Sequence, residues 1–396
     1  MNKVERMSIQ QATEAIIDYR GKTPPKSSSG VRLVTAKVVK GGQILDEPAE
    51  YILSSYYDEW MRRGLPRRLD VLITTEAPLG EVAILKKEAR IALAQRIILL
   101  RANPQCVDPV YLFYALQSDF GQAELRARAS GTTVLGIKQS ELRNALIPVF
   151  ALPIQRRIAG ILSAYDDLIE NSQRRIKIRE EMARRLYREW FVHFRFPGHE
   201  VCLLVESPLG EIPEGWEVKA LGQVVELNYG KALKKEERID GPFPVFGSSG
   251  QVGTHILSLT KGPGIVVGRK GNVGSVFWCD DDFFVIDTAY FVTSALPLRF
   301  LYYLFPSLNF INSDAAVPGL SRNQAYSLEV IVPPVPVLDS FCKQIDIIEG
   351  QASLLAKQIQ NLRRTRDLLL PRLLSGQIDV EILSEPPDAD QDACKY

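Results

Sequence analysis

A long internal repeat constrains this sequence more than any other feature. Residues 133–190 align without a gap to residues 316–373, at a constant offset of 183, so that Gly136 meets Gly319 and Pro153 meets Pro336. Shorter segments earlier in each copy also correspond at other offsets: IDYRGK resembles LNYGK, and YLFYAL resembles FLYYLF. Self-similarity of this length indicates a duplicated structural unit. We expect two globular parts that have diverged with insertions, each followed by a helical segment that has kept its length.

Each copy ends in a predicted long helix. After Pro153 and Pro336, apolar residues recur at alternating spacings of four and three, with charged residues between them. A pattern sustained over about four heptads is typical of a coiled coil. The predicted seam positions are Ile158, Leu162, Tyr165, Ile169, Ser172, Ile176, Arg179, Ala183, Leu186 and Trp190 in the first helix, and Phe341, Ile345, Ile348, Ala352, Leu355, Ile359, Leu362, Arg366, Leu369 and Leu373 in the second.

These two helical arms predict a spacer. Each has about 40 residues and would extend roughly 60 Å at about 1.5 Å per residue. Pro197-Gly198 is expected to end the first arm, and Pro371 predicts a kink or break near the end of the second. Two arms of one chain pack most naturally antiparallel about a pseudo-two-fold axis. We therefore expect them to separate the two globular domains by a fixed distance.

The globular segments are expected to be mixed α/β, with short strands bounded by Gly, Pro and Asp. Apolar runs at VLIT, VAIL, IILL, IVVG and FVI predict strands, and PVYLFYALQSD and PLRFLYYLF predict short helices. The expected organisation is a first domain at 1–150, a helical arm at 151–196, a connector at 197–211, a second domain at 212–335, a second arm at 336–383 and a disordered acidic tail at 384–396.

Polar loops between the predicted strands are candidate nucleic-acid contacts. Lys and Arg can bind phosphates, and Ser, Thr, Asn and Gln can reach base edges; the alternative is that these loops are solvated turns. The candidates in the first domain are Arg20, Lys22, Thr23, Thr74, Thr75, Gln95, Arg96 and Thr132. Those in the second domain are Lys231, Ser248, Ser249, Arg269, Lys270, Asn272, Ser321 and Arg322.

The net charge of +1 conceals an asymmetry. Residues 1–196 carry 31 Lys and Arg against 22 Asp and Glu, a net charge of +9, whereas the rest of the chain has a net charge of −8. A basic half is compatible with phosphate binding, although many enzymes show a similar asymmetry.

Motifs for catalysis are missing from the sequence. It has no GxxxxGK[ST] phosphate loop, no Gly-rich cofactor fingerprint and no Asn/Asp-Pro-Pro-aromatic tetrad. The acidic run at 280–282 is better explained as a turn than as a metal site, and the five cysteines form no Cys-x-x-Cys pair. We therefore expect no catalytic residues, no metal and no cofactor.

Scattered cysteines also favour a reducing cytoplasm over a disulfide framework. The chain has no run of 18 apolar residues, and its first residues include no apolar core of a signal peptide. We expect a cytoplasmic protein that does not cross a membrane.

The segment from Gln155 to Gly198 resembles the central conserved region of the DNA specificity subunits of type I restriction–modification systems. SGTTVLGIKQSELRNALIPVFALP resembles the end of their target-recognition domains, and IPEGWEVKALGQVVELNYGK resembles the opening of a second such domain. The resemblance extends to about residue 383.

This resemblance implies a subunit that binds double-stranded DNA and is not itself an enzyme. Each target-recognition domain would read one half of an asymmetric, bipartite site through the major groove. Half-sites one helical turn apart would be separated by roughly 34 Å. The arms would bind two methyltransferase subunits, which use S-adenosylmethionine to methylate a flipped adenine. Two ATP-driven motor-nuclease subunits would complete the restriction complex.

Two other classes of protein stay open at this point. One is a self-contained DNA methyltransferase or nuclease with recognition domains, which the missing cofactor motifs disfavour. The other is a coiled-coil adaptor that binds only proteins, which the duplicated domains with Lys, Arg, Ser and Thr loops disfavour.

Overall fold

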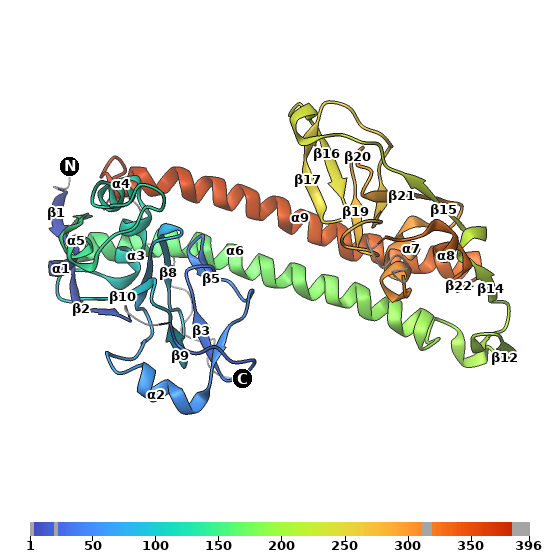
Figure 1. The fold of residues 1–396 in the computed structure, drawn as a ribbon, viewed down its shortest axis with the longest axis horizontal. Coiled ribbons are helices and arrows are strands. Elements are labelled where there is room, and N and C mark those ends of the chain that lie inside the picture. The colour runs from blue at the N-terminus through green and yellow to red at the C-terminus, as the bar shows by residue number, and fades with distance from the viewer. Residues whose placement is uncertain (1–3, 20–22, 311–318, 382–396) are drawn as a thin grey trace. The chain divides into compact units, whose positions relative to one another are not determined.

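The computed structural model describes residues 4–19, 23–310 and 319–381. The candidates Arg20 and Lys22 and the acidic tail at 384–396 lie outside these residues. The chain forms two compact units, one of residues up to Ser172 together with those from Gln358 onward, and one of residues Gln173–Lys357. Each unit therefore contains one globular part and a segment of each long helix (Figure 1).

The first unit has a four-stranded antiparallel sheet at its centre, in the order β2-β10-β7-β8. Beside it lies a three-stranded sheet in the order β6-β3-β9, in which β3 and β9 are parallel. The strands are β1 (Glu5–Ser8), β2 (Thr13–Asp18), β3 (Val31–Val34), β4 (Val39–Lys40), β5 (Gln43–Ile44), β6 (Tyr51–Ile52), β7 (Val71–Thr75), β8 (Leu79–Ile84), β9 (Ile91–Leu93), β10 (Ile97–Ala102) and β11 (Leu146–Val149). The helices are α1 (Ile9–Ala12), η1 (Ser54–Tyr56), α2 (Tyr57–Trp60), α3 (Pro109–Gln117), α4 (Asp119–Ala127) and α5 (Gln139–Asn144).

Helix α3 closes the core of this unit. Asp108 caps its N-terminus, because the carboxylate accepts the backbone N–H groups of Val110 at 2.9 Å and Tyr111 at 3.0 Å. Pro109 follows at the first helical position, where its missing N–H costs nothing. The helix thereby begins at the predicted residue, and its buried residues pack with those of β7, β10 and β11.

The second unit repeats this arrangement. Its strands are β12 (Leu204–Ser207), β13 (Gly210–Pro213), β14 (Glu217–Ala220), β15 (Val225–Tyr229), β16 (Phe243–Gly247), β17 (Gly250–His255), β18 (Gly264–Gly268), β19 (Val276–Cys279), β20 (Phe284–Val285), β21 (Ala289–Ser294) and β22 (Glu329–Val332). Its short helices are η2 (Arg188–Val192), η3 (His199–Val201), η4 (Leu221–Gln223), η5 (Lys235–Glu237), α7 (Leu298–Leu304), η6 (Phe305–Ser307) and α8 (Arg322–Ser327).

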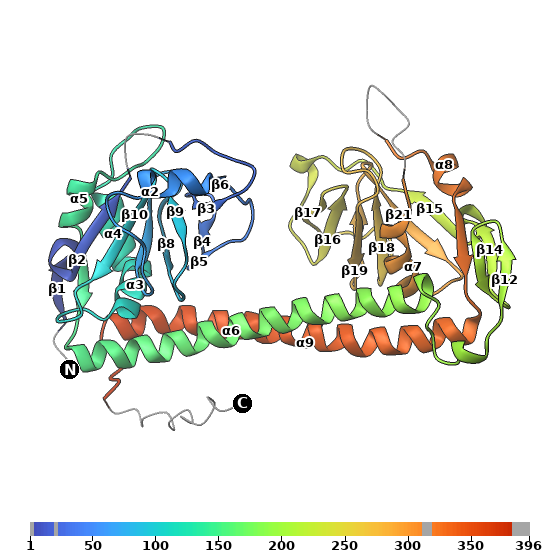
Figure 2. The same cartoon turned by 90° about the horizontal axis from the view of Figure 1, so that it is seen from below.

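Sheet topology confirms the internal repeat. The order β15-β21-β18-β19 matches β2-β10-β7-β8, and β17-β16-β20 matches β6-β3-β9, again with a parallel pair, β16 and β20. The first and last strands of each copy also pair, β1 with β11 and β14 with β22. Figure 2 shows the same succession of elements in both globular parts. The predicted mixed α/β class with two long helices is confirmed.

The arms are α6 (Leu152–Tyr187) and α9 (Val335–Leu374). They run antiparallel within each unit. The start of α6 packs against the end of α9 in the first unit, and the end of α6 packs against the start of α9 in the second. All twenty predicted seam positions are buried or half-buried, which confirms the heptad assignment. Their pattern continues across Ser172, which is buried.

The break predicted at Pro371 is wrong. Helix α9 continues past Pro371 to Leu374. Gly376, two residues further on, has a φ of +74°, a left-handed conformation that favours glycine and is common just after a helix. Proline removes only one hydrogen bond this close to a helix end, and Ser375 still donates its N–H to the Pro371 carbonyl at 3.0 Å. The apolar face that includes Leu373 stays packed in the core of the first unit.

A tyrosine joins each globular part to an arm at equivalent positions of the repeat. In the first unit, Tyr114 of α3 donates to Asp166 of α6 at 2.5 Å. In the second unit, Tyr303 of α7 donates to Glu349 of α9, also at 2.5 Å. Burial, and then the neighbouring carboxylate, raises the pKa of Tyr114, so this hydroxyl stays a donor. The offset of 183 relates Asp166 to Glu349, so this contact belongs to the duplicated unit.

Candidate nucleic-acid interface

Each globular part has an open hollow at the same place, where a central strand ends. In the first unit, the Ile137 N–H donates to the Thr75 carbonyl at 2.9 Å. In the second, the Leu320 N–H donates to the Arg269 carbonyl at 2.7 Å. These bonds tie the loop before α5 or α8 to the end of β7 or β18. The two hollows are therefore equivalent positions of the repeat.

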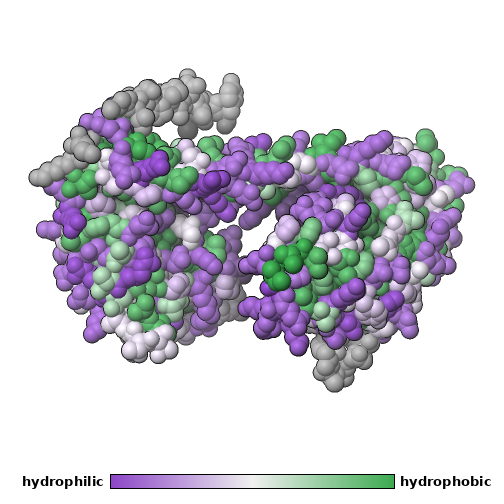
Figure 3. All heavy atoms as spheres, turned by 90° about the horizontal axis from the view of Figure 1, so that it is seen from above, coloured by the Kyte–Doolittle hydropathy of each residue, from purple (hydrophilic) through white to green (hydrophobic). Residues whose placement is uncertain are grey.

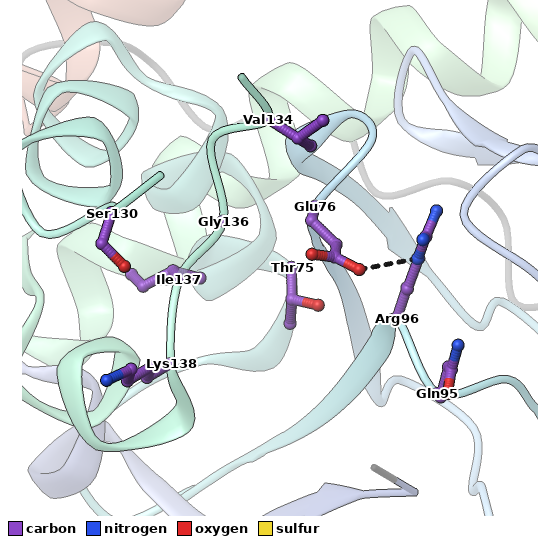
Figure 4. Close-up of a pocket in the computed structure, with 9 residues that line it drawn as sticks. All are labelled: Thr75, Glu76, Gln95, Arg96, Ser130, Val134, Gly136, Ile137 and Lys138. Atoms are coloured by element: carbon purple, nitrogen blue, oxygen red, sulfur yellow. Dashed lines mark ion pairs between the residues drawn. The ribbon is translucent and has the colours of Figure 1, made fainter. Parts of the chain in front are cut away.

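The first hollow has a volume of about 340 Å³ and is lined by Thr75, Glu76, Gln95, Arg96, Ser130, Val134, Gly136, Ile137 and Lys138. Glu76 and Arg96 extend toward each other from adjacent strand ends, and their Oε1 and Nε atoms are 2.7 Å apart (Figure 4). Both side chains are nearly half exposed. Lys138 lies across the hollow from Arg96, with Thr75 between them in this view. The hollow thus presents two charged donors, Arg96 and Lys138, and the amide of Gln95 beside the single carboxylate of Glu76.

The second hollow, of about 510 Å³, is lined by Tyr229, Arg269, Lys270, Tyr290, Gly319, Leu320, Ser321, Arg322 and Asn323. Two guanidinium groups lie over the Tyr229 ring, that of Arg322 at 4.4 Å and that of Arg269 at 5.0 Å from the centroid. Arg269 also donates to the Asp287 carbonyl at 2.9 Å. Cation–π contacts of this kind hold guanidinium groups in place.

The two tyrosines of this hollow have opposite pKa shifts. A hydrogen bond with Tyr290, followed by the hydrogen bond and charge of Arg322, lowers the pKa of Tyr229. Burial raises the pKa of Tyr290 to about 12, and its hydroxyl donates to the Leu320 carbonyl at 3.1 Å. Tyr290 therefore helps to hold the loop, whereas Tyr229 supports the two arginines.

Seven of the sixteen candidate residues line these hollows, and Thr75 is the buried one among them. The seven are Thr75, Gln95, Arg96, Arg269, Lys270, Ser321 and Arg322. Five others lie exposed on loops outside the hollows, namely Thr23, Thr132, Lys231, Ser249 and Asn272. Asn272 donates to the Ser249 hydroxyl at 3.3 Å, so these two belong to one polar surface. Ser248 is buried beside them.

Thr74 requires a correction. Its side chain is fully buried, and its hydroxyl accepts the Glu81 N–H at 2.9 Å within the β7–β8 hairpin. A side chain without solvent exposure cannot reach a base edge while the strand stays folded. Thr74 is therefore a structural residue. Its polar residue type was a misleading signal, because Thr74 is the last residue of the predicted strand VLIT and β7 extends through Thr75.

Sequence reasoning missed several lining residues, above all Glu76, Lys138, Tyr229, Tyr290 and Asn323. Glu76 adjoins the predicted contact Thr75 in the sequence. Lys138 corresponds to Ser321 at the offset of 183, and Tyr229 lies in the repeated LNYGK motif, so the repeat itself was the available signal. Tyr290 is inside a strand, and only the folded structure places it beside Arg269.

Within the described residues, no group of three or more His, Cys, Asp or Glu side chains could hold a metal ion. The acidic run at 280–282 forms the loop between β19 and β20. Among the helices of those same residues, none is long and apolar enough to cross a membrane.

The chain thus contains two copies of one fold, each with a polar hollow of different lining. Residues 64–180 and 213–364 match the family model of the type I restriction modification DNA specificity domain. The chain belongs to this family, whose members are the non-catalytic DNA specificity subunits of type I restriction–modification complexes. Its role is DNA sequence specificity, and the family assembles with modification and restriction subunits.

Similar proteins extend over most of the chain. The type I restriction enzyme MjaIX specificity subunit of Methanocaldococcus jannaschii is 26% identical and matches 79% of this chain and 78% of its own length. The MjaVIII specificity subunit of the same organism is 22% identical over 88% of this chain and 92% of its own. The crystal structure of an S subunit from M. genitalium shares the fold, with a TM-score of 0.58 at 18% identity, covering 94% of this chain and 96% of that one. Family membership decides against the self-contained enzyme and the adaptor.

Proposed function

We propose that this subunit binds an asymmetric, bipartite site in double-stranded DNA, one half-site per globular domain. The observation that carries the proposal is the pair of equivalent hollows with different linings, a Glu76–Arg96 pair in one and an arginine–tyrosine cluster in the other. Because the two hollows lie at equivalent places, both domains can approach the major groove in the same way. Because their side chains differ, the two domains can read two different base sequences. The proposed recognition domains are residues 1–150 and 212–335, and the proposed contacts are the predicted residues other than the buried Thr74, Thr75 and Ser248.

We further propose that the arms bind two DNA methyltransferase subunits, and that two motor-nuclease subunits join the complete complex. The visible face of the arms in Figure 3 is mainly hydrophilic, with separate hydrophobic side chains among the polar ones. Large apolar side chains that are more than half exposed occur on both helices, and they are suited to partner contact. They are Ile178, Met182, Ile347, Leu354 and Leu368.

The substitution Glu76→Gln tests the half-site assignment. It removes the carboxylate that holds Arg96, so the freed guanidinium can contact a different base acceptor. We expect the preference at one base pair of a single half-site to change by about 1 kcal/mol, or about fivefold. The measurement is methylation of a duplex series by the complex of this chain with its methyltransferase partner.

Glu88→Gln is the matched control, since Glu88 has the same charge and lies exposed on a loop of the same domain. Its complex should keep the original preference at every position. Equal changes in both half-sites, or a change with Glu88→Gln as large as that with Glu76→Gln, would contradict the assignment.

A further inference from the structure

We propose that the hollow of the second domain reads guanine, with Arg322 as the principal reading residue and Tyr229 as its support. This inference rests on the proposed function, because it names the base that one of the two half-sites must contain. Arg322 would direct its planar donor edge toward O6 and N7 of the guanine, the commonest specific contact in the major groove.

The first support is the position of the guanidinium groups. Arg322 lies over the face of Tyr229 at 4.4 Å, and Arg269 lies over the same ring at 5.0 Å. A guanidinium has five N–H groups in its plane, so those of Arg322 that do not bond to Tyr229 stay available to acceptors. Because stacking also restricts side-chain freedom, less conformational entropy remains to be lost when a base binds.

The second support is uncompensated charge. In the described part of the chain, no ion pair with a carboxylate is formed by Arg269, Lys270 or Arg322. The equivalent hollow of the first domain differs, since its Arg96 is paired with Glu76 at 2.7 Å. Described lining residues that carry several cations and pair with no described carboxylate are suited to a ligand edge that carries acceptors. Guanine presents two such acceptors, whereas adenine and cytosine each present an amino donor in the major groove and thymine presents one acceptor beside a methyl group.

The third support distinguishes a base contact from a phosphate contact. Arg322 is half-buried within a concave hollow, and it begins α8 directly after Ser321. The Lys270–Gly319 bridge and the Leu320 N–H bond to Arg269 fix the loop that precedes it. A phosphate contact needs charge but little geometric restraint, whereas a bidentate contact with a base edge needs the fixed backbone seen here.

The test uses the complete complex of this chain with its methyltransferase partner. Methylation rates are measured on duplexes in which each base pair of both half-sites is replaced in turn. The variants are Arg322→Gln, which removes the guanidinium, and Arg322→Lys, which keeps the charge but loses the planar fork. Lys261→Gln is the control, because Lys261 is exposed in the same domain and does not line the hollow.

We expect both Arg322 variants to lose discrimination for one G·C pair in one half-site by about 5- to 150-fold. The Lys261 variant should discriminate as the unmodified chain does. If Arg322→Gln weakens methylation of every duplex equally and Arg322→Lys restores it, Arg322 contacts a phosphate and the inference is overturned.

A recognition motif without a G·C pair in the half-site affected by these variants would overturn it as well. If the Gln variant does not fold, as judged from its thermal unfolding, the Lys variant alone still separates a base contact from a phosphate contact. Loss of discrimination for one G·C pair indicates the base contact, and unchanged discrimination indicates the phosphate contact. Failure of the proposed function would look different: the unmodified complex itself would show no dependence on two separate half-sites.

Discussion

Deletion of one heptad from each arm is expected to shorten the unspecified gap between the two half-sites and to leave both half-sites recognisable. Residues 169–175 of α6 and 356–362 of α9 are suitable, because they lie between two cross-helix contacts. Arg366 pairs with Asp166 at 2.5 Å in the first unit, and Arg179 donates to Gln351 at 3.0 Å in the second. Seven residues preserve the heptad seam on both sides of the deletion.

The expected size of the change follows from helix geometry. Seven residues correspond to about 10 Å of helix, or about three base pairs of duplex. Sequencing of methylated sites in cells that carry the shortened chain measures the gap directly. Deletion from one arm alone is the control, and it should abolish the complex because one arm is then about 10 Å shorter than the other, so that the cross-helix contacts on the two sides of the deletion cannot form together. An unchanged gap in the doubly shortened chain would show that the arms do not set the spacing.

The substitution Asp166→Ala is expected to destabilise the first unit by about 3 kcal/mol. Asp166 accepts from Tyr114 of the globular part and pairs with Arg366 of the other arm, so one carboxylate connects three elements. Its side chain is only 17% exposed, and that of Arg366 is 24% exposed. Removal of the carboxylate leaves the buried Tyr114 hydroxyl without this acceptor, and Arg366 keeps only its pair with the exposed Asp367 at 2.8 Å. Both losses are less exposed to water than the loss of a surface ion pair, so they cost more.

Asp167→Ala is the matched control for this prediction. Asp167 is the next residue on α6, is 67% exposed and pairs with Lys86 at 2.8 Å. Its loss should cost no more than about 1 kcal/mol. Urea unfolding of the two variants beside the unmodified chain measures both values. Similar costs for the two substitutions would show that Asp166 does not anchor the domain to the arms.

The arms and the repeat were predictable because local pattern determines them. A heptad seam depends on spacing along one helix, and the offset of 183 between the copies required only comparison of the chain with itself. Strands and short helices were also foreseen where apolar runs meet Gly, Pro or Asp. The error at Pro371 has a local cause, since proline near a helix end removes little when Leu373 stays packed.

The site was predictable only in part, because it depends on contacts between distant segments. Arg96 and Arg269 could be proposed from loop position and charge. The ion pair of Arg96 with Glu76 and the stacking of Arg322 on Tyr229 depend on loops that meet only after folding. Thr74 shows the converse, since a polar residue next to a loop can point into the core.

The most direct test of the central claim is the genome-wide pattern of adenine methylation in the host with and without this chain. The proposed function predicts that removal of the chain abolishes methylation at one asymmetric motif made of two half-sites and a fixed gap, and that its return restores this motif. A methylation pattern that does not change on removal of the chain, while the methyltransferase partner is present and active, would contradict the proposed function.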